Sequence, residues 1–140
     1  ALPLYALPDG ELGPFDVRFP EGRPRGVARY RLEARAQQAG QTGALLDAGT
    51  FDWEDRAEYD ETGQLHIRGT VWHVGDAPAY DPQAVITLFD SADRVIGVAA
   101  ASIGDGPLPP GGSLRFDVPL LPGGAEPVRY QVTIQARRQP

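Results

Sequence analysis

Short alternations of apolar and polar residues run through the chain from residue 50 onward. In "LHIRGTVWHV", Leu65, Ile67 and Val71 fall on one side of an extended chain, and the residues between them fall on the other. In "RYQVTIQA", Val132 and Ile134 alternate with polar residues in the same way. A period of two indicates β-strands with one buried face, which is typical of antiparallel sheets.

Turn-rich joints such as "DETG", "DSAD" and "GDGPLPPGG" separate seven short runs. These runs are "TFDW", "RAEY", "LHIRGTVWHV", "AVITLFD", "VIGVAAASI", "SLRFDV" and "RYQVTIQAR". Strands of this length and spacing predict an all-β fold, an antiparallel β-sandwich of about seven strands. Trp53, on the short first strand, is expected to lie in the core.

One phrase occurs twice, as "PFDVRFPEG" over residues 14–22 and as "RFDVPLLPG" over residues 115–123. Aligning the copies also brings Arg29-Tyr30 onto Arg129-Tyr130, with matching alternation after each pair. The period is about a hundred residues, the size of an immunoglobulin-like domain. We therefore predict that residues 1–40 hold the last two strands of a preceding repeat plus a linker, and that residues 41–140 form a complete domain. The alternative is chance similarity between two hairpins rich in Pro and Gly.

Two interpretations compete for "GVARYRLEARAQQ", residues 26–38. Its Ala, Arg, Leu, Glu and Gln residues favour a helix by propensity alone. The alignment with the second copy favours a strand, which we predict. In the first copy of the phrase, Phe15 and Val17 are then expected to face a core, and Asp16 and Arg18 to face solvent.

Composition excludes several classes of protein. A net charge of −6 over 140 residues, with no basic run, argues against nucleic-acid binding. The absence of Cys excludes a disulfide framework, thiol catalysis and zinc sites built on thiolates. No apolar run approaches the roughly 20 residues of a membrane helix, so we expect no membrane insertion of this chain. The chain begins without Met, which fits either a removed signal peptide or an excised fragment.

The second unit resembles the FxLYD family of small bacterial immunoglobulin-like domains. "ITLFD", residues 86–90, resembles Phe-x-Leu-Tyr-Asp, with Ile86 in place of Phe and Phe89 in place of Tyr. "IRGTVWHVGDAPA", "DSADRVIG" and "LPPGGSLRFDV" resemble, in the family's order, a strand ending in Gly-x-Val-x-Asn-x-Gly, a turn with its next strand, and a loop entering the penultimate strand. His73 takes the Asn place. The resemblance implies a secreted or cell-envelope protein. The family has no known catalytic residues that could be assigned to positions of this sequence.

No candidate for catalysis or metal binding is complete. His66 and His73 are seven positions apart on one strand and so point to opposite faces, which excludes a shared metal; each is expected at the surface or at a strand end. The acidic run "FDWEDRAEYDETG" lacks the spacing of a calcium loop and is expected to be the solvated side of an edge strand. The serines show no nucleophile signature. We expect no enzyme activity and no cofactor.

One face of the strand around Trp72 is the candidate binding surface. Along the predicted strand, Trp72 points to the same side as His66 and Arg68, opposite the apolar residues. Tyr80 follows in the next loop. An exposed indole can stack on a sugar ring or anchor a protein interface, whereas the structural alternative is that this face is covered. Two functions remain. One is a structural or interaction module with a protein partner or self-assembly, including strand pairing through residues 1–37. The other is a carbohydrate-binding module using Trp72 with Tyr80 or Tyr59 on a cell-wall glycan.

Overall fold

The computed structural model describes residues 26, 31, 33, 45, 46, 48–120 and 126–139. A short 3-10 helix, η2 (Ala48–Thr50), leads into the first strand. The strands are β1 (Phe51–Tyr59), β2 (Leu65–His73), β3 (Tyr80–Phe89), β4 (Val95–Ser102), β5 (Ser113–Leu120) and β6 (Arg129–Arg137).

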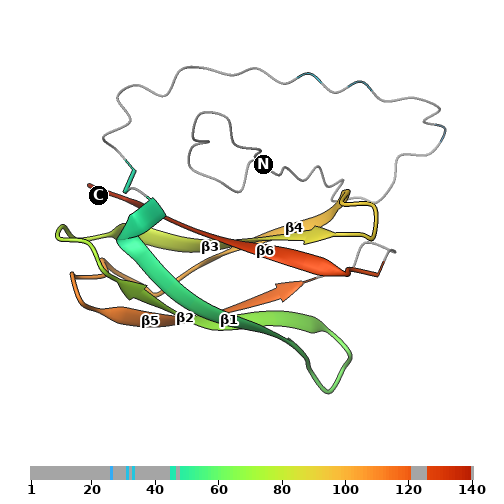
Figure 1. Ribbon diagram of the computed structural model, residues 1–140, viewed down its shortest axis with the longest axis horizontal. Helices are drawn as coiled ribbons and strands as arrows, with labels where there is room; N and C mark the ends of the chain where they lie inside the picture. The colour runs from blue at the N-terminus through green and yellow to red at the C-terminus, as the bar shows by residue number, and fades with distance from the viewer. Residues whose placement is uncertain are drawn as a thin grey trace.

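The six strands form two three-stranded sheets, in the orders β1-β2-β5 and β4-β3-β6. Every neighbouring pair of strands is antiparallel. Figure 1 shows one sheet lying over the other, with the β1-β2-β5 sheet at the bottom. The prediction of an all-β, antiparallel, sandwich-like fold is therefore confirmed.

The core lies between the two sheets and follows the predicted alternation. On β2, Leu65, Ile67 and Val71 are buried, and on β5 Phe116 and Val118 are buried. The buried apolar cluster comprises Phe51, Leu65, Ile67, Val71, Ala79, Ala84, Ile86, Leu88, Ile103, Leu108, Phe116, Val118, Leu120, Val132, Ile134 and Ala136. Strand β3 departs from strict alternation, because it is buried at every position from 84 to 88.

The seven predicted runs correspond to six strands in the described residues. "TFDW" and "RAEY" are not separate strands, because β1 continues through both without a break in its pairing to β2. Glu54 lies opposite Thr70 and Asp55 opposite Gly69, in the same register as the residues on either side. The two predicted runs left out Glu54 and Asp55, but backbone pairing with β2 keeps the chain extended through both residues.

Aspartates shape both of the hairpin turns. Between β1 and β2, the Asp60 Oδ1 atom accepts hydrogen bonds of 2.9 Å from the Thr62 and Gln64 amides. The amide of Asp60 donates to the Gln64 carbonyl at 2.9 Å, and the amide of Gly63 donates to the Asp60 carbonyl at 3.0 Å. Gly63 has a φ of 80°, a backbone conformation that glycine adopts easily.

The β3–β4 turn repeats this arrangement in "DSADR". Asp90 Oδ1 accepts from the amides of Ala92 at 2.9 Å and Arg94 at 3.0 Å. Asp93 stands where the first turn has Gly63, and its φ is 55°. The last residue of "ITLFD" is thus a turn residue whose side chain organises the hairpin.

The second copy of the repeated phrase shows the burial predicted for the first. Phe116 and Val118 are buried, and Asp117 between them is exposed. The first copy, with Phe15 and Val17, lies outside the described residues, as does most of the strand pair predicted within residues 1–37. The described chain runs along the end of β6 at Leu45, which bridges Arg137, and at Leu46, whose amide donates to the Ala136 carbonyl at 3.2 Å.

His73 lies at a strand end but not at the surface. Of the two places expected for it, the strand end is confirmed, because His73 is the last residue of β2, and the surface is wrong, because the residue is only 1% exposed. It lies opposite Phe51 with ring centroids 5.4 Å apart, and its backbone pairs with the loop at Gly111 and Gly112. The end of this strand is buried because that loop and the start of β1 close over it.

Candidate functional site

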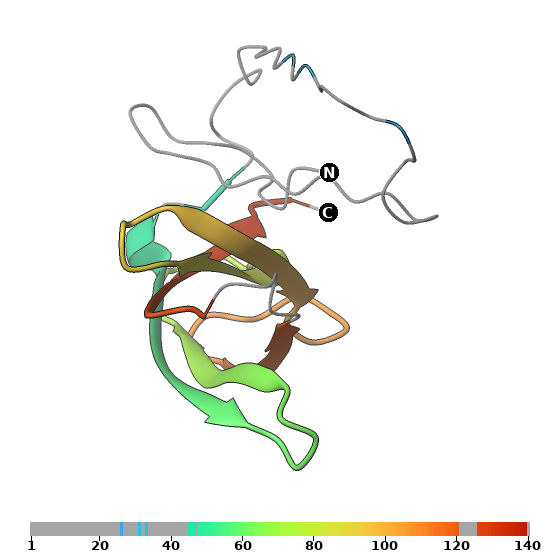
Figure 2. The ribbon, with the colours of Figure 1, turned by 90° about the vertical axis from the view of Figure 1, so that its right-hand side faces the viewer.

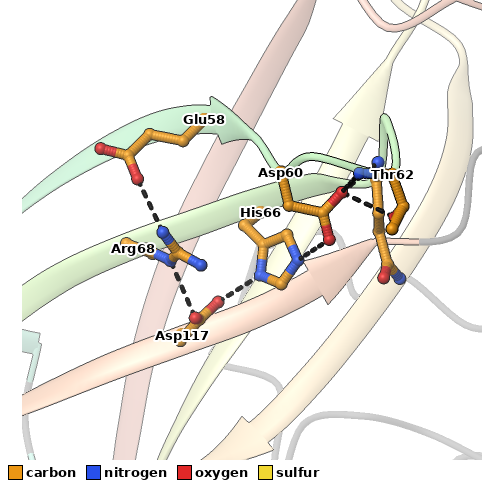
Figure 3. A network of polar contacts seen from close by, with 7 residues as sticks. Glu58, Asp60, Thr62, His66, Arg68 and Asp117 are labelled. Atoms are coloured by element: carbon orange, nitrogen blue, oxygen red, sulfur yellow. Dashed lines mark hydrogen bonds and ion pairs between the residues drawn. The ribbon is translucent and has the colours of Figure 1, made fainter.

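The candidate site is a polar network on the outer face of the β1-β2-β5 sheet, drawn in Figure 3. Alternation along β2 turns Ile67 into the core and leaves His66 and Arg68 on the outer face. The register sets Glu58 of β1 opposite His66, and Asp117 of β5 opposite Arg68. Side chains from three strands therefore meet on one surface.

Asp117 links the two β2 residues. Its Oδ1 atom lies 2.6 Å from His66 Nδ1, and its Oδ2 atom accepts a hydrogen bond of 2.8 Å from Arg68 Nε. Arg68 Nη1 donates to Glu58 Oε2 at 2.9 Å, and Glu58 also accepts from Arg56. These contacts tie the outer face of β2 to both neighbouring strands.

The other side of His66 faces the hairpin turn. Its Nε2 atom lies 3.4 Å from Asp60 Oδ2, within ion-pair range but without hydrogen-bond geometry. Asp60 Oδ1 also accepts from the Thr62 hydroxyl at 2.7 Å. The imidazole, 14% exposed, thus lies between two carboxylates.

The network favours ionised carboxylates. The Thr62 hydroxyl and the Gln64 amide lower the pKa of Asp60 to about 2. Hydrogen bonds from Arg56 and Arg68 lower the pKa of Glu58. Desolvation opposes ionisation of Asp117, but hydrogen bonds from His66 and Arg68 outweigh it and lower its pKa. Asp117 and Glu58 in turn raise the pKa of Arg68.

The contacts of the network connect β2 to β1 and to β5. A histidine held by a carboxylate can serve as a base, but nucleophilic catalysis also needs a nucleophile within reach. The nearby hydroxyl, that of Thr62, already donates to Asp60. Searching the residues that the structure describes finds no group of three His, Cys, Asp or Glu side chains suited to a metal ion. Nor does a helix in this part have the length and apolar character to cross a membrane.

The predicted binding residues divide between two places. Trp72 is 38% exposed on the same face as His66 and Arg68, toward the other end of β2, and lies opposite Asp52 and Ser113. Tyr80 begins β3 in the other sheet and is half-buried. Trp72 and Tyr80 thus belong to different sheets.

Sequence reasoning missed the roles of Glu58 and Asp117. Both stand at alternating polar positions, but only the cross-strand register shows which charges meet. The sequence did indicate that Asp117 faces outward, because it stands between two apolar residues, Phe116 and Val118, in an alternating run.

The prediction that Trp53 lies in the core was wrong. Trp53 does stand opposite the buried Val71, on the core-facing side of β1, but it is 40% exposed. On the same side Tyr59 is 67% exposed, and Asp55 accepts a 2.6 Å hydrogen bond from the Tyr130 hydroxyl of β6. The described part contains no strand beyond β6 to cover the rest of β1. Figure 2 shows the β1–β2 hairpin projecting from the sandwich.

We compared the chain with protein-family models, with curated protein sequences and with solved structures, and none of the three comparisons found a match.

Proposed function

We propose that this chain is a non-catalytic structural and interaction module, and that its β1–β2 hairpin contacts the partner. One observation carries the proposal. Among the described residues, the exposed large aromatic side chains are Trp53, Tyr59 and Trp72, and all three lie on this hairpin. Aromatic residues are enriched at the energetic centres of protein interfaces.

The polar network supports the same proposal. It fixes β2 to β1 and β5 through charge-assisted hydrogen bonds, so the hairpin is held in a defined shape. A rigid hairpin loses little conformational freedom on binding, which favours affinity.

We further propose that the domain is of the immunoglobulin-like FxLYD type and belongs to a secreted or cell-envelope bacterial protein. The order of the four motifs supports this assignment. Asp90 adds a physical reason for the aspartate of "ITLFD", because its side chain caps the β3–β4 turn.

Quantitative capture of proteins from a cell-envelope extract of the source organism tests the interaction role. The full chain is immobilised as wild type, as Trp53→Ser with Tyr59→Ser, and as the control Val128→Ser, which alters a 65% exposed residue away from the hairpin. The wild type and the control should retain the same proteins, and the hairpin variant should lose them. Equal capture by all three would contradict the proposal.

A second candidate function is carbohydrate binding through Trp72. The exposed indole with polar Asp52 and Ser113 across the adjacent strands favours it, since sugars combine stacking with hydrogen bonds. A glycan array probed with wild type and Trp72→Ala separates the candidates. Binding that is lost in the variant supports the carbohydrate function, and no binding by the wild type rejects it.

A further inference from the structure

Strand β1 lies at the edge of its sheet, because among the described strands it pairs with β2 alone. The two ends of the hairpin show which backbone groups of β1 face β2. At one end the Val74 amide donates to the Thr50 carbonyl at 2.9 Å, and at the other the Asp60 amide donates to the Gln64 carbonyl at 2.9 Å. The register between these two ends contains no shift.

The backbone groups of alternate β1 residues therefore face the free edge. Along an antiparallel pair, hydrogen-bonded and non-hydrogen-bonded positions alternate, so the even-numbered residues of β1 bind β2. The carbonyl oxygen of Glu54 agrees with this, since a Cβ atom at Gly69 of β2 would lie 2.2 Å from it. The amides and carbonyls of Trp53, Asp55 and Ala57 then face the free edge. An edge of this kind is a template for the addition of another strand.

The outer side of β1 is acidic. It carries Asp52, Glu54, Arg56 and Glu58. Arg56 is bound to Glu58, which also accepts from Arg68, so these two charges of opposite sign already lie together in the polar network. The exposed Asp52 and Glu54 lie outside that network, and an added strand would meet them with its own outer side chains.

The core-facing side of β1 is apolar apart from Asp55, which accepts the Tyr130 hydroxyl. Trp53, Ala57 and Tyr59 are exposed on this side. Side chains that stand opposite each other on neighbouring strands interact directly. A strand with basic residues on one side and apolar residues on the other therefore matches β1 on both sides.

A second copy of β1 matches poorly. Two β1 strands paired about Asp55, the register with full overlap, would set Asp55 against Asp55 and Asp52 against Glu58. Only Glu54 and Arg56 would be attracted to each other, and Arg56 is already bound. Like charges directly opposite destabilise a strand pair, so the charges favour a different strand over self-association.

We propose that an extended segment of the partner protein adds to the free edge of β1 as an antiparallel strand. Its arginine or lysine side chains lie opposite Asp52 and Glu54, and its apolar side chains lie beside Trp53. All strand pairs in the described part of the chain are antiparallel, and antiparallel pairing is the more stable kind. This inference rests on the proposed interaction role of the hairpin, and it names the mode of binding and the chemistry of the partner strand.

NMR of the full chain with a synthetic peptide tests the proposal. The probe is Val-Arg-Val-Arg-Val-Arg-Val with blocked ends, which places its arginines on one side and its valines on the other. Binding should slow hydrogen exchange at the amides of Trp53, Asp55 and Ala57, and should leave the amides of β6, an edge of the other sheet, unchanged. The same peptide with methylated valine amides keeps its charge but cannot form the ladder, so it should protect none of these amides.

Charge reversal tests the match between the two strands. The variant Asp52→Arg with Glu54→Arg should bind the arginine peptide about tenfold more weakly, because two attractive charge pairs become repulsive. It should bind instead the peptide with glutamate in place of arginine. The control Asp76→Arg with Asp105→Arg makes the same change in net charge at exposed positions of the β2–β3 and β4–β5 loops, and it should bind like the wild type. Circular dichroism checks that each variant is folded.

Four results would overturn the inference: a wild type that does not bind the arginine peptide, equal binding of the methylated peptide, protection of β6 in place of β1, or equal binding by the two charge variants. The capture experiment is independent of these results, because it removes Trp53 and Tyr59 and uses no peptide. Capture that is lost in the hairpin variant, with no peptide binding, would keep the proposed function and reject strand addition. Equal capture by all chains, with peptide binding, would do the reverse.

Discussion

Gly69, at the middle of β2, shows how a missing side chain shapes the sandwich. A Cβ atom there would lie 2.2 Å from the Glu54 carbonyl oxygen and 2.5 Å from Cζ of Phe116. Phe116, opposite Gly69 on β5, therefore occupies the space that a side chain would take. The glycine of "RGTV" is required by this close approach.

Replacing Gly69 by Ala is expected to destabilise the protein by about 2–3 kcal/mol. The added methyl group would clash with the Glu54 carbonyl oxygen and with the buried ring of Phe116, and relieving both clashes requires the backbone and the ring to shift. Urea denaturation followed by fluorescence measures the change. Gly106→Ala is the matched control, since a Cβ atom there meets nothing within 4 Å, and its stability should stay near that of the wild type. An equal effect at both sites would contradict the packing account.

Tyr130 links the sheets by donating to Asp55. This bond, with desolvation, raises the pKa of Tyr130 to about 12 from its ordinary 10.0. A raised pKa in the folded state contributes stability below pH 10 that is lost as the pH rises toward 12. Tyr130→Phe should lower the free energy of unfolding by about 1 kcal/mol at neutral pH. Between pH 10 and 12 this variant should lose less stability than the wild type, because it has no hydroxyl to ionise. Denaturation at neutral and alkaline pH tests this, with Tyr59→Phe, at an exposed position, as control.

The two hairpin turns use the same hydrogen bonds with different residues at the left-handed position. Gly63 adopts a positive φ without strain, whereas Asp93 does so with a side chain that pairs with Arg129 at 2.9 Å. At Asp93 the strained backbone therefore lowers the stability of the fold, and the ion pair with Arg129 raises it. The ion pair is exposed, so its contribution to stability is small.

Exchanging residues at the left-handed position should have opposite effects in the two turns. Gly63→Ala is expected to destabilise by about 1 kcal/mol, because a Cβ atom disfavours this conformation. Asp93→Gly is expected to raise stability by about 0.5 kcal/mol, since relief of strain outweighs the loss of the ion pair. Thermal and urea unfolding of both variants measures the difference. Stabilisation by Gly63→Ala would refute the turn assignment.

Acid should weaken the β1–β2 turn through Asp60. Its pKa is lowered from 3.8 to about 2, so the ionised carboxylate contributes stability above pH 4 that is lost as the pH falls toward 2. Asp60→Asn keeps an acceptor oxygen but does not titrate, so its stability should fall less steeply over this range. Thr62→Val removes the strongest contributing hydrogen bond and should raise the Asp60 pKa toward its ordinary value. Carboxyl titration by NMR checks both, and an unchanged pKa in Thr62→Val would contradict this cause.

For the whole molecule, alternation predicted the all-β class, most strand positions and which residues of β2 face outward. It placed His66 and His73 on opposite faces, as found, but not the burial of His73, which depends on a loop distant in sequence. The runs predicted from the sequence left out Glu54 and Asp55, whereas pairing with β2 carries β1 through both residues. Alternation assigns a residue to a face and says nothing about what covers that face.

Trp53 illustrates the same limit for the candidate site. Its position on the core-facing side of β1 follows from sequence, but its exposure depends on where the opposite sheet ends. The polar network likewise needed the cross-strand register. The uncovered hairpin that supports the proposed function was visible only once both sheets were in place.

The central claim is that the β1–β2 hairpin contacts the partner, and chemical protection of Trp53 tests it most directly. In a Trp72→Phe variant, Trp53 is the remaining tryptophan of the chain. This variant is treated with a tryptophan-selective oxidant, alone and loaded with the proteins that it captures from the envelope extract, and oxidation of Trp53 is read by mass spectrometry. Trp53 should be oxidised more slowly in the loaded chain. Equal rates of oxidation at Trp53 in the bare and the loaded chain would contradict the claim.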